Sequence, residues 1–163
     1  MSGQDFTCIR RFKVSDVRVV RELIHYTIDV SYFPVYPPRA IQFFKDFHSE
    51  AKIIERHQKG EILVAENNGK VIGTGSIVCA DILGVFVDPG FQHQGHGQSL
   101  MRALEKKAIA NGISEVVLSV SLPSRRFYES LEYEIIEDCT IDVGEGQRLD
   151  YWEAKKTLMI GKS

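Results

Sequence analysis

The stretch of this sequence best suited to chemistry is a glycine-rich loop between an apolar, β-like run and a helix. Residues 92–97 read QHQGHG, and they follow the run 82–87 and lead directly into an amphipathic segment. The first N–H groups of a helix have no internal acceptor, and the helix dipole makes that end electropositive. Glycine also lets a backbone come close to a ligand. The pattern predicts a cradle for phosphate or pyrophosphate oxygens, with a plain strand-to-helix turn as the alternative.

Two histidines and three cysteines could also bind a metal or react. His93 and His96 have the spacing of a ligand pair, but neither a helical frame nor a third ligand accompanies them, so we predict no metal. They are interpreted as polar loop residues, whose charging near pH 6.5 could modulate phosphate binding. Cys8, Cys79 and Cys139 are odd in number, widely spaced and never form CxxC, which favours a reducing cytoplasm over a disulfide framework. Cys79 falls nearest the predicted cleft, where an apolar filler is favoured over a nucleophile.

The composition excludes several classes of protein. The chain has 163 residues, 44% of them hydrophobic, with 20 basic against 22 acidic residues and a net charge of −2. This balance gives no electrostatic reason to bind nucleic acid or an anionic membrane. The apolar runs are too short to span a bilayer. We expect a single domain over residues 1–163, because that length is enough for one core.

The elements that must position the loop can be read from hydrophobic periodicity and turn residues. We expect strands at 7–12, 61–66, 70–80, 82–87, 115–120, about 133–142 and 147–157. Helices are expected at about 16–30, about 40–59, from the glycine-rich loop to about 111, and at 122–131. The order β-α-α-β-β-β-α-β-α-β-β predicts an α/β fold with a mixed sheet.

Two motifs in this framework resemble the GNAT superfamily of N-acetyltransferases. Gln92, Gly95 and Gly97 match the family pattern Gln/Arg-x-x-Gly-x-Gly/Ala after a strand, although His93 stands where the family usually has glycine. Downstream, the run Phe127-Tyr128-Glu129 resembles the family's later motif. Ser121 replaces the asparagine of that motif and Glu132 its glycine. The resemblance covers about residues 6–158.

The resemblance implies a GNAT-like acyl-CoA N-acyltransferase fold and direct transfer of an acetyl group from acetyl-CoA, the co-substrate, to an amine. The pantetheine arm would lie along the strand that ends at Val87, and the pyrophosphate would sit on the N–H groups of residues 93–98. The residues that the resemblance assigns to cofactor binding are Val85, Phe86, Val87, Gln92, His93, Gln94, Gly95, His96, Gly97, Gln98, Ser121 and Ser124.

Two further residues are candidates for catalysis by the same resemblance. An alkylammonium with a pKa near 10.4 is neutral about once in 2,500 molecules at pH 7, a handicap of roughly 4.6 kcal/mol that a base would reduce. Asp81 stands where relatives place an acidic residue or its water relay, and the alternative is a solvated carboxylate at a strand end. Tyr128 matches the tyrosine that protonates the CoA sulfur or donates a hydrogen bond to it, and the alternative is a core tyrosine beside Phe127.

The acceptor is expected to be an amine of a small molecule or peptide, acting with a monomer or homodimer. In the resembling fold, the loop 32–38 and the turn between the last two strands would wall the acceptor pocket. The carboxylates of Asp142, Glu145 and Asp150 could attract a cationic acceptor there, or could be exposed charges on a hairpin. A non-catalytic acyl-CoA-binding or regulatory module, or an interaction domain on the same scaffold, is the alternative to an enzyme.

Overall fold

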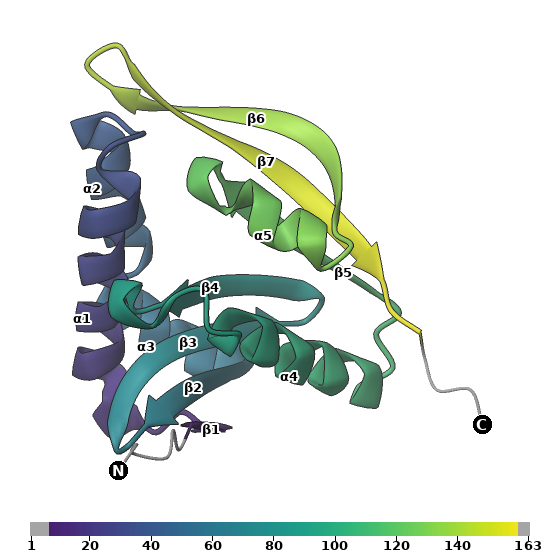
Figure 1. Cartoon of the computed structure of the whole chain (residues 1–163). Helices are drawn as coiled ribbons and strands as arrows, with labels where there is room; N and C mark the ends of the chain where they lie inside the picture. Colours follow the sequence, from purple (N-terminus) through teal and green to yellow (C-terminus); the bar gives the residue numbers. More distant parts are fainter. Residues whose placement is uncertain (1–6, 160–163) are drawn as a thin grey trace.

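The computed structural model describes residues 7–159, which form one seven-stranded mixed sheet and five α-helices (Figure 1). The strands are β1 (Thr7–Arg11), β2 (Glu61–Asn67), β3 (Lys70–Val78), β4 (Asp81–Val87), β5 (Glu115–Ser121), β6 (Glu134–Gly144) and β7 (Gln147–Thr157). The helices are α1 (Val17–Thr27), α2 (Pro38–Phe47), α3 (Glu50–Lys59), α4 (His96–Ala110) and α5 (Arg125–Ser130). The spatial order of the strands is β1-β2-β3-β4-β5-β7-β6. The expected α/β class with a mixed sheet is therefore confirmed.

The first four strands are joined in antiparallel fashion, and the β2–β3 turn is set by its sequence. Asn68 and Gly69 both have positive φ angles, of 50° and 83°. A two-residue hairpin loop with this backbone matches the right-handed twist of its strands, and asparagine followed by glycine is its preferred sequence. The predicted tight turn is thus present and fixes the register of β2 against β3.

The centre of the sheet is irregular at β4. Leu83 pairs with Ser76 and Phe86 with Thr74, so that Gly84 and Val85 together oppose a single residue of β3. This is a β-bulge, and Gly84 adopts a φ of +64° within it. On its other side β4 pairs with β5 in parallel through one registered pair at its first residue, Asp81. No further pair of β4 and β5 is in register, which leaves the rest of the β4 edge open on the β5 side.

One predicted helix is in fact two. The apolar spacing over 40–59 predicts a continuous helix, but α2 ends at Phe47 and α3 begins at Glu50. Ser49 caps α3, because its hydroxyl oxygen accepts a hydrogen bond from the Lys52 amide at 3.2 Å. A serine hydroxyl that satisfies an N-terminal amide favours a new helix start over continuation. His48, at the break, takes a non-helical backbone with φ −116° and ψ 40°.

Two other helix boundaries differ from those expected. The first helix does not stop at about residue 30, because a π-helical turn, Ile28–Tyr32, continues it. The helix expected over 122–131 starts as a 3-10 turn, Leu122–Ser124, and becomes α-helical at Arg125. The π-helical turn contains Tyr32 and the 3-10 turn contains Ser124, and both residues line the pockets described in the next section.

The helices cover the two faces of the sheet and define two cores. On one face, Leu100 and Leu104 of α4 are fully buried against the central strands. On the other face, Val20 and Ile24 of α1 pack in a second cluster with residues of α2 and α3. Phe86 of β4 belongs to this second cluster. The β6–β7 hairpin curves away from the first four strands and reaches over toward α2 (Figure 1). Within residues 7–159, no helix is both long and apolar enough to cross a bilayer.

Candidate active site at the split between the central strands

The glycine-rich loop presents its backbone to solvent at the start of α4. Gly95 is the N-cap of α4, with a φ of +88° that side chains rarely tolerate. A Cβ placed on Gly95 would meet no atom within 4 Å, so the space above the helix N-terminus is open. His93 also has a positive φ, of 63°, and is exposed. The position where the family usually has glycine therefore keeps a glycine-like backbone.

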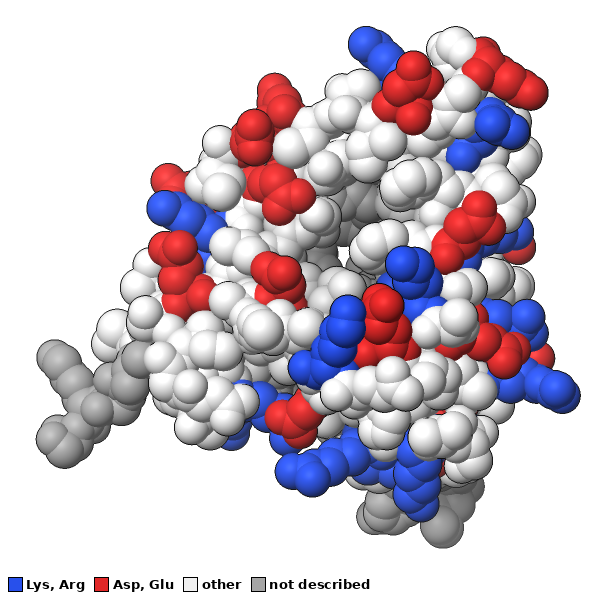
Figure 2. Space-filling view, turned by 180° about the vertical axis from the view of Figure 1, so that it is seen from behind, with Lys and Arg blue, Asp and Glu red and all other residues white. Residues whose placement is uncertain are grey.

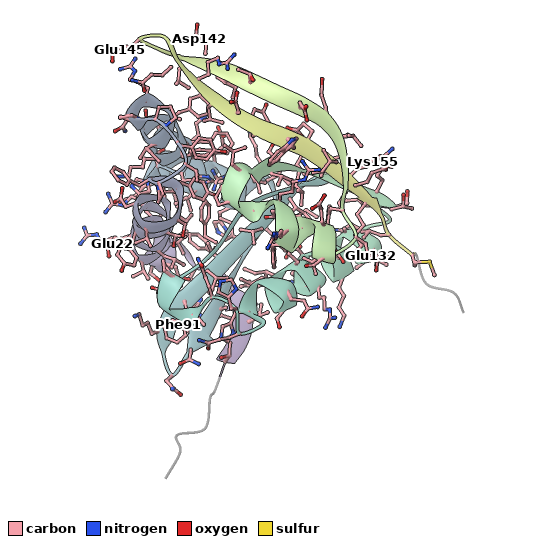
Figure 3. All side chains as sticks on the ribbon, turned by 45° about the horizontal axis from the view of Figure 1, so that its top comes forward. Glu22, Phe91, Glu132, Asp142, Glu145 and Lys155 are labelled. Carbon is pink, nitrogen blue, oxygen red and sulfur yellow. The ribbon has the colours of Figure 1, made fainter. Side chains whose placement is uncertain are left out.

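Neighbouring contacts hold this loop in place. The Gln92 side chain donates a hydrogen bond from Nε2 to the carbonyl of Val87 at 2.9 Å, which ties the loop to the end of β4. Asp88 accepts a hydrogen bond from the Gly90 amide at 2.8 Å and so closes the turn that carries Phe91. Figure 3 labels Phe91 beside this turn. A loop fixed at both sides keeps its amides in place for a ligand.

Gly97 and His96 contribute to packing. A Cβ on Gly97 would lie 3.0 Å from Cζ of Phe127, so the absence of a side chain lets α4 and α5 approach each other. His96 is 7% exposed, and its Nε2 is buried without a hydrogen-bond partner in the described part of the chain. His93 is exposed and His96 is buried, so the two rings are not presented together. Among residues 7–159, no group of three side chains suited to a metal ion is found.

A pocket of about 730 Å³ extends from this loop along β4. The predicted cofactor-binding residues that line it are Val85, Phe86, Val87, Gln92, His93, Gly95, Gly97, Gln98 and Ser124. Gln94 and His96 do not line it, and Ser121 lines the adjoining pocket instead. Thr27, Ser31 and Arg126 also line this pocket, although no motif in the sequence pointed to them.

A second pocket, of about 410 Å³, lies on the other side of the β4 bulge. Aromatic side chains from α2 form one wall, and residues of β6 and β7 form the opposite wall, among them Phe43, Phe44, Phe47, Ile141, Leu149 and Tyr151. Asp81 and Glu153 are the acidic residues of its lining, and His48 is its imidazole. We call it the acceptor pocket. A hollow is visible near the middle of the face shown in Figure 2, among charges of both signs.

The two pockets share a common wall. Tyr32, Val85, Phe86, Ser124 and Tyr128 line both of them. This junction lies where the bulge interrupts the β3–β4 pairing and β4 separates from β5. A group bound in one pocket can therefore meet a group bound in the other beside Tyr128.

Tyr128 is held by aromatic packing. Its ring is 7% exposed and packs edge-on against Phe127 and Tyr133, at centroid distances of 5.0 and 5.8 Å. No hydrogen bond of the Tyr128 hydroxyl is found among residues 7–159. Burial, and to a smaller degree the neighbouring Tyr32, raises the pKa of Tyr128 well above its ordinary value. The phenol stays protonated at neutral pH and can donate a hydrogen bond into the junction.

Tyr32 belongs to the loop 32–38 that was expected to wall the acceptor pocket, and it lines both pockets. The π-helical turn after α1 carries it into the junction, where it is 8% exposed. Single π-helical turns of this kind occur often at functional sites. Burial raises the pKa of Tyr32, and hydrogen bonding with Ser121 and Ser124 opposes the rise. Those two serine hydroxyls are 2.7 Å apart. The sequence analysis placed Tyr32 at the acceptor pocket only as part of that loop; its place at the junction depends on the π-helical turn and on long-range packing.

Asp81 lies at the far end of the acceptor pocket. It is exposed at the first position of β4 and pairs with Val117 across the only registered β4–β5 contact. Four residue steps along the strand separate it from Val85, a span on the order of 13 Å. A base at this position would act on an amine at the junction through a chain of water molecules. Glu153 lines the same pocket and accepts a hydrogen bond from the Ser119 hydroxyl at 2.7 Å.

Asp142, Glu145 and Asp150, the carboxylates that were expected to attract a cationic acceptor, line neither pocket. Asp142 accepts a hydrogen bond from the Gly144 amide at 2.9 Å, and Asp150 accepts one from the Thr140 hydroxyl at 2.7 Å. Figure 3 places Asp142 and Glu145 at the outer tip of the hairpin. These contacts favour a role in shaping the hairpin. Cys79 is exposed in the β3–β4 turn and lines neither pocket, contrary to its expected place near the cleft.

Comparison with known proteins agrees with this architecture. Residues 58–135 match the family described as the acetyltransferase (GNAT) domain. An acetyltransferase of Pectobacterium atrosepticum is 35% identical over 102 residues, which cover 57% of this chain and 68% of that protein. The chain belongs to the GNAT superfamily of acetyltransferases. Membership supports acyltransferase activity and CoA binding.

Solved structures show the same fold. A GCN5-related N-acetyltransferase from Rhodopseudomonas palustris superposes with a TM-score of 0.85 at 21% identity, covering 97% of this chain and 99% of the other. The PaiA N-acetyltransferase from Thermoplasma acidophilum, solved in complex with coenzyme A, gives a TM-score of 0.73 at 20% identity, with coverages of 93% and 99%. At these identities the likeness concerns the fold alone.

Proposed function

We propose that this protein is an N-acetyltransferase that moves an acetyl group directly from acetyl-CoA to an amine of a small molecule or peptide. The observation that carries the proposal is the meeting of two pockets at the β4 bulge, with the Tyr128 hydroxyl between them. One pocket has the shape and backbone donors for a CoA-type ligand. The other has the aromatic walls and acidic residues that suit an amine.

The residues present fit acetyl-CoA as the donor. Gly95 leaves open space above the N-terminus of α4, where unpaired amides and the helix dipole favour a pyrophosphate. The edge of β4 from Val85 to Val87 has no paired strand on the β5 side, so its backbone groups can bind the amides of a pantetheine arm as a partial extra strand. Acetyl-CoA supplies an activated acetyl group when it is bound there.

The junction supplies hydrogen-bond donors for the transfer. In a bulge the extra residue is left out of the ladder, so a backbone amide at Gly84 or Val85 is available for the acetyl carbonyl oxygen, on which negative charge develops. Tyr128 donates its phenolic hydrogen bond toward the sulfur that leaves. A neutral amine that attacks loses one proton and the departing thiolate gains one, so the transfer itself is balanced. The proton that must first leave an alkylammonium goes to a base.

Asp81 is the proposed base, acting directly or through water. The acceptor pocket connects its carboxylate to the junction, and the distance along the strand favours the water chain. Without such a base the reaction draws on the small neutral fraction of the amine. The three free cysteines support the further proposal that the protein works in the reducing cytoplasm, as a monomer or homodimer.

The proposal is tested by following thiol release from acetyl-CoA in the presence of a panel of primary amines, with the acetylated product identified by mass spectrometry. We expect amine-dependent CoA release and a product heavier by one acetyl group. A non-catalytic acyl-CoA-binding module predicts acetyl-CoA binding in calorimetry with no amine-dependent release. An interaction domain predicts no binding of acetyl-CoA at all.

A further inference from the structure

A buried histidine at the α2–α3 break faces the acceptor pocket. His48 is 5% exposed, lines that pocket, and packs edge-on against Phe86 at a centroid distance of 5.1 Å. Its Nδ1 lies 2.9 Å from Nη2 of Arg56. Arginine can only donate, so Nδ1 accepts, and the neutral ring must carry its hydrogen on Nε2. No partner for that Nε2 is found within residues 7–159, so it presents a donor to the pocket.

The backbone of the break holds the ring in this orientation. His25 donates a hydrogen bond from Nε2 to the carbonyl of His48 at 3.0 Å. Arg56 donates from Nη2 to the carbonyl of Phe47 at 2.6 Å, at the C-terminus of α2 where carbonyls lack helical partners. Burial, reinforced by the charge of Arg56, lowers the pKa of His48 well below 6.5. The imidazole is therefore a neutral donor at physiological pH.

Arg56 brings a buried positive charge behind this donor. It is 6% exposed, and burial lowers the pKa of Arg56 to about 10, so the guanidinium is still charged at neutral pH. No carboxylate of residues 7–159 lies within 4 Å of it. Its Nη1 reaches to 3.0 Å from where a Cβ on Gly84 would stand, directly beneath the bulge. Buried charges are normally paired, but here the Phe47 ring, 5.3 Å from Cζ of Arg56, and the charge of Glu55 beyond ion-pair distance favour the charged form without an ion pair.

Charges of opposite sign thus lie at the two ends of the acceptor pocket. Arg56, which lies behind His48 and does not itself line the pocket, makes the α2–α3 corner electropositive, while Asp81 and Glu153 make the β4–β7 end electronegative. A simple cationic amine would be attracted to the acidic end and would leave the His48 donor and the Arg56 charge unmatched. A ligand with both a negative and a positive group matches both ends.

We infer that the acceptor is an amine that carries a carboxylate, and that His48 selects it by donating a hydrogen bond from Nε2 to that carboxylate. This inference rests on the proposed function and names the substrate class of the same site. Arg56 acts through His48: it fixes the tautomer and supplies the positive charge that favours an anion. The carboxylate accepts the hydrogen bond while the amine of the same molecule reaches the junction beside Tyr128.

The experiment compares acceptors that differ in the carboxylate alone. The panel contains glycine, β-alanine, 4-aminobutyrate, 6-aminohexanoate, leucine and phenylalanine, each beside its amide and its decarboxylated amine, with CoA release as the readout. We expect the best carboxylate acceptor to exceed its amide and its amine by at least tenfold in kcat/KM, as a hydrogen bond to a charged group requires. Equal rates within threefold across every matched set would overturn the inference and leave the proposed function standing.

Substitutions locate the effect. His48→Phe should reduce the carboxylate-to-amine ratio to within threefold, and His48→Gln, which keeps an N–H donor, should retain part of it. His57→Gln is the matched control, because His57 packs against Phe12 outside both pockets and the ratio should not change. A ratio that survives in His48→Phe would show that another residue selects the carboxylate.

A binding measurement covers the case in which no amine of the panel is acetylated. Calorimetry of the N-acetylated carboxylates and of their amides, with and without CoA, should show at least tenfold tighter binding of a carboxylate. Such a preference without turnover would contradict the proposed function and uphold the inference. Equal binding of carboxylates and amides, or no binding of either, would overturn the inference.

Discussion

At the scale of single residues, the chemistry of the junction depends on how acidic its phenols are. Burial raises the pKa of Tyr128, whereas a thiol has a pKa near 8.5. Complete proton transfer from Tyr128 to a leaving thiolate would therefore be uphill. A hydrogen bond to the developing charge needs no such transfer and is strengthened by the low dielectric of the site. Tyr128 is better suited to stabilise the thiolate than to protonate it outright.

The Tyr128→Phe substitution tests this role. We expect turnover to fall at least tenfold, because the hydrogen bond forms to charge that appears during the reaction, while CoA affinity stays within threefold. Steady-state kinetics and calorimetry provide the two values. Tyr133→Phe is the matched control: it removes a buried phenol that donates to Glu105 at 2.6 Å outside both pockets, so stability should fall and turnover should not. Unchanged turnover in Tyr128→Phe would remove this tyrosine from the mechanism.

The base is tested by a pH dependence. Asp81→Asn should lower kcat/KM for an alkylamine at least tenfold at pH 7, and the deficit should shrink as the pH approaches 10, because the amine then loses its proton without help. Glu153→Gln changes the other carboxylate of the same pocket and serves as the comparison. Values of kcat/KM measured from pH 7 to 10 decide between the two carboxylates. A loss of kcat/KM at pH 7 in Glu153→Gln alone would assign the role of the base to Glu153.

Sequence motifs identified the residues that act through backbone or local spacing, but did not single out those that tertiary packing brings to the site. Gly95 and Tyr128 lie in contiguous patterns, so they could be selected without coordinates. Tyr32 and His48 reach the site through a π-helical turn and a helix break. Their position depends on tertiary packing: the loop 32–38 was expected only as a wall of the acceptor pocket, and Ser49 was the one local signal of the break beside His48.

At the scale of elements, the helix break shows why apolar spacing alone was insufficient. Phe44, Phe47, Ala51 and Ile54 continue one helical period across residues 48 and 49, and neither glycine nor proline interrupts them. Ser49 was the available signal, as a capping residue followed by an acidic first turn. Whether the chain breaks at Ser49 or continues as one helix depends on packing. Here Arg56 and His25 donate hydrogen bonds to the carbonyls of residues 47 and 48, which stabilises the break.

Stability should depend on pH through this break. The folded pKa of His48 lies below that of the unfolded chain, so unfolding takes up a proton, and its stabilising contribution is complete above about pH 6.5. As the pH falls below 6.5 the free energy of unfolding should decrease, by at most about 1.4 kcal/mol per pH unit from this group. Denaturant unfolding at pH 7.5, 6.5 and 5.5 provides the measurement. The His48→Phe variant should show a shallower slope, and an equal slope would assign the effect to other groups.

The loop before α4 makes a second prediction at this scale. Gly95→Ala forces a side chain into a φ of +88°, which costs about 1–2 kcal/mol, and should weaken CoA binding by at least fivefold through the displaced amides. His93→Gly is the matched variant: it places glycine at a φ of +63° and should leave both stability and CoA affinity within about twofold or 0.5 kcal/mol. Equal CoA affinities for the two variants would contradict the cradle. Thermal unfolding and calorimetry measure both effects.

At the scale of the whole molecule, the seven-stranded sheet consists of two parts with little pairing between them. The β1–β4 part and the β5–β7–β6 part join through the single registered pair of Asp81 and Val117, with α4 and α5 packed across one face. The hydrophobic pattern of the sequence predicted where each strand lies along the chain, but not that β4 and β5 pair at one position only. The bulge at Gly84 and the separation of β4 from β5 depend on how neighbouring strands pair, and the two pockets form where these irregularities occur.

A ligand that lies across this split should therefore stabilise the molecule. CoA at 100 times its dissociation constant should raise the free energy of unfolding by about 2.7 kcal/mol, which for a chain of this size corresponds to a Tm increase of about 5–10 °C. Hydrogen exchange should slow at the amides of residues 85–87 and 93–98, because these would be bound by the pantetheine arm and the pyrophosphate. Pantetheine, which lacks the diphosphate, should protect residues 85–87 without residues 93–98. Protection confined to other regions would contradict the placement of the donor along β4 and at the start of α4.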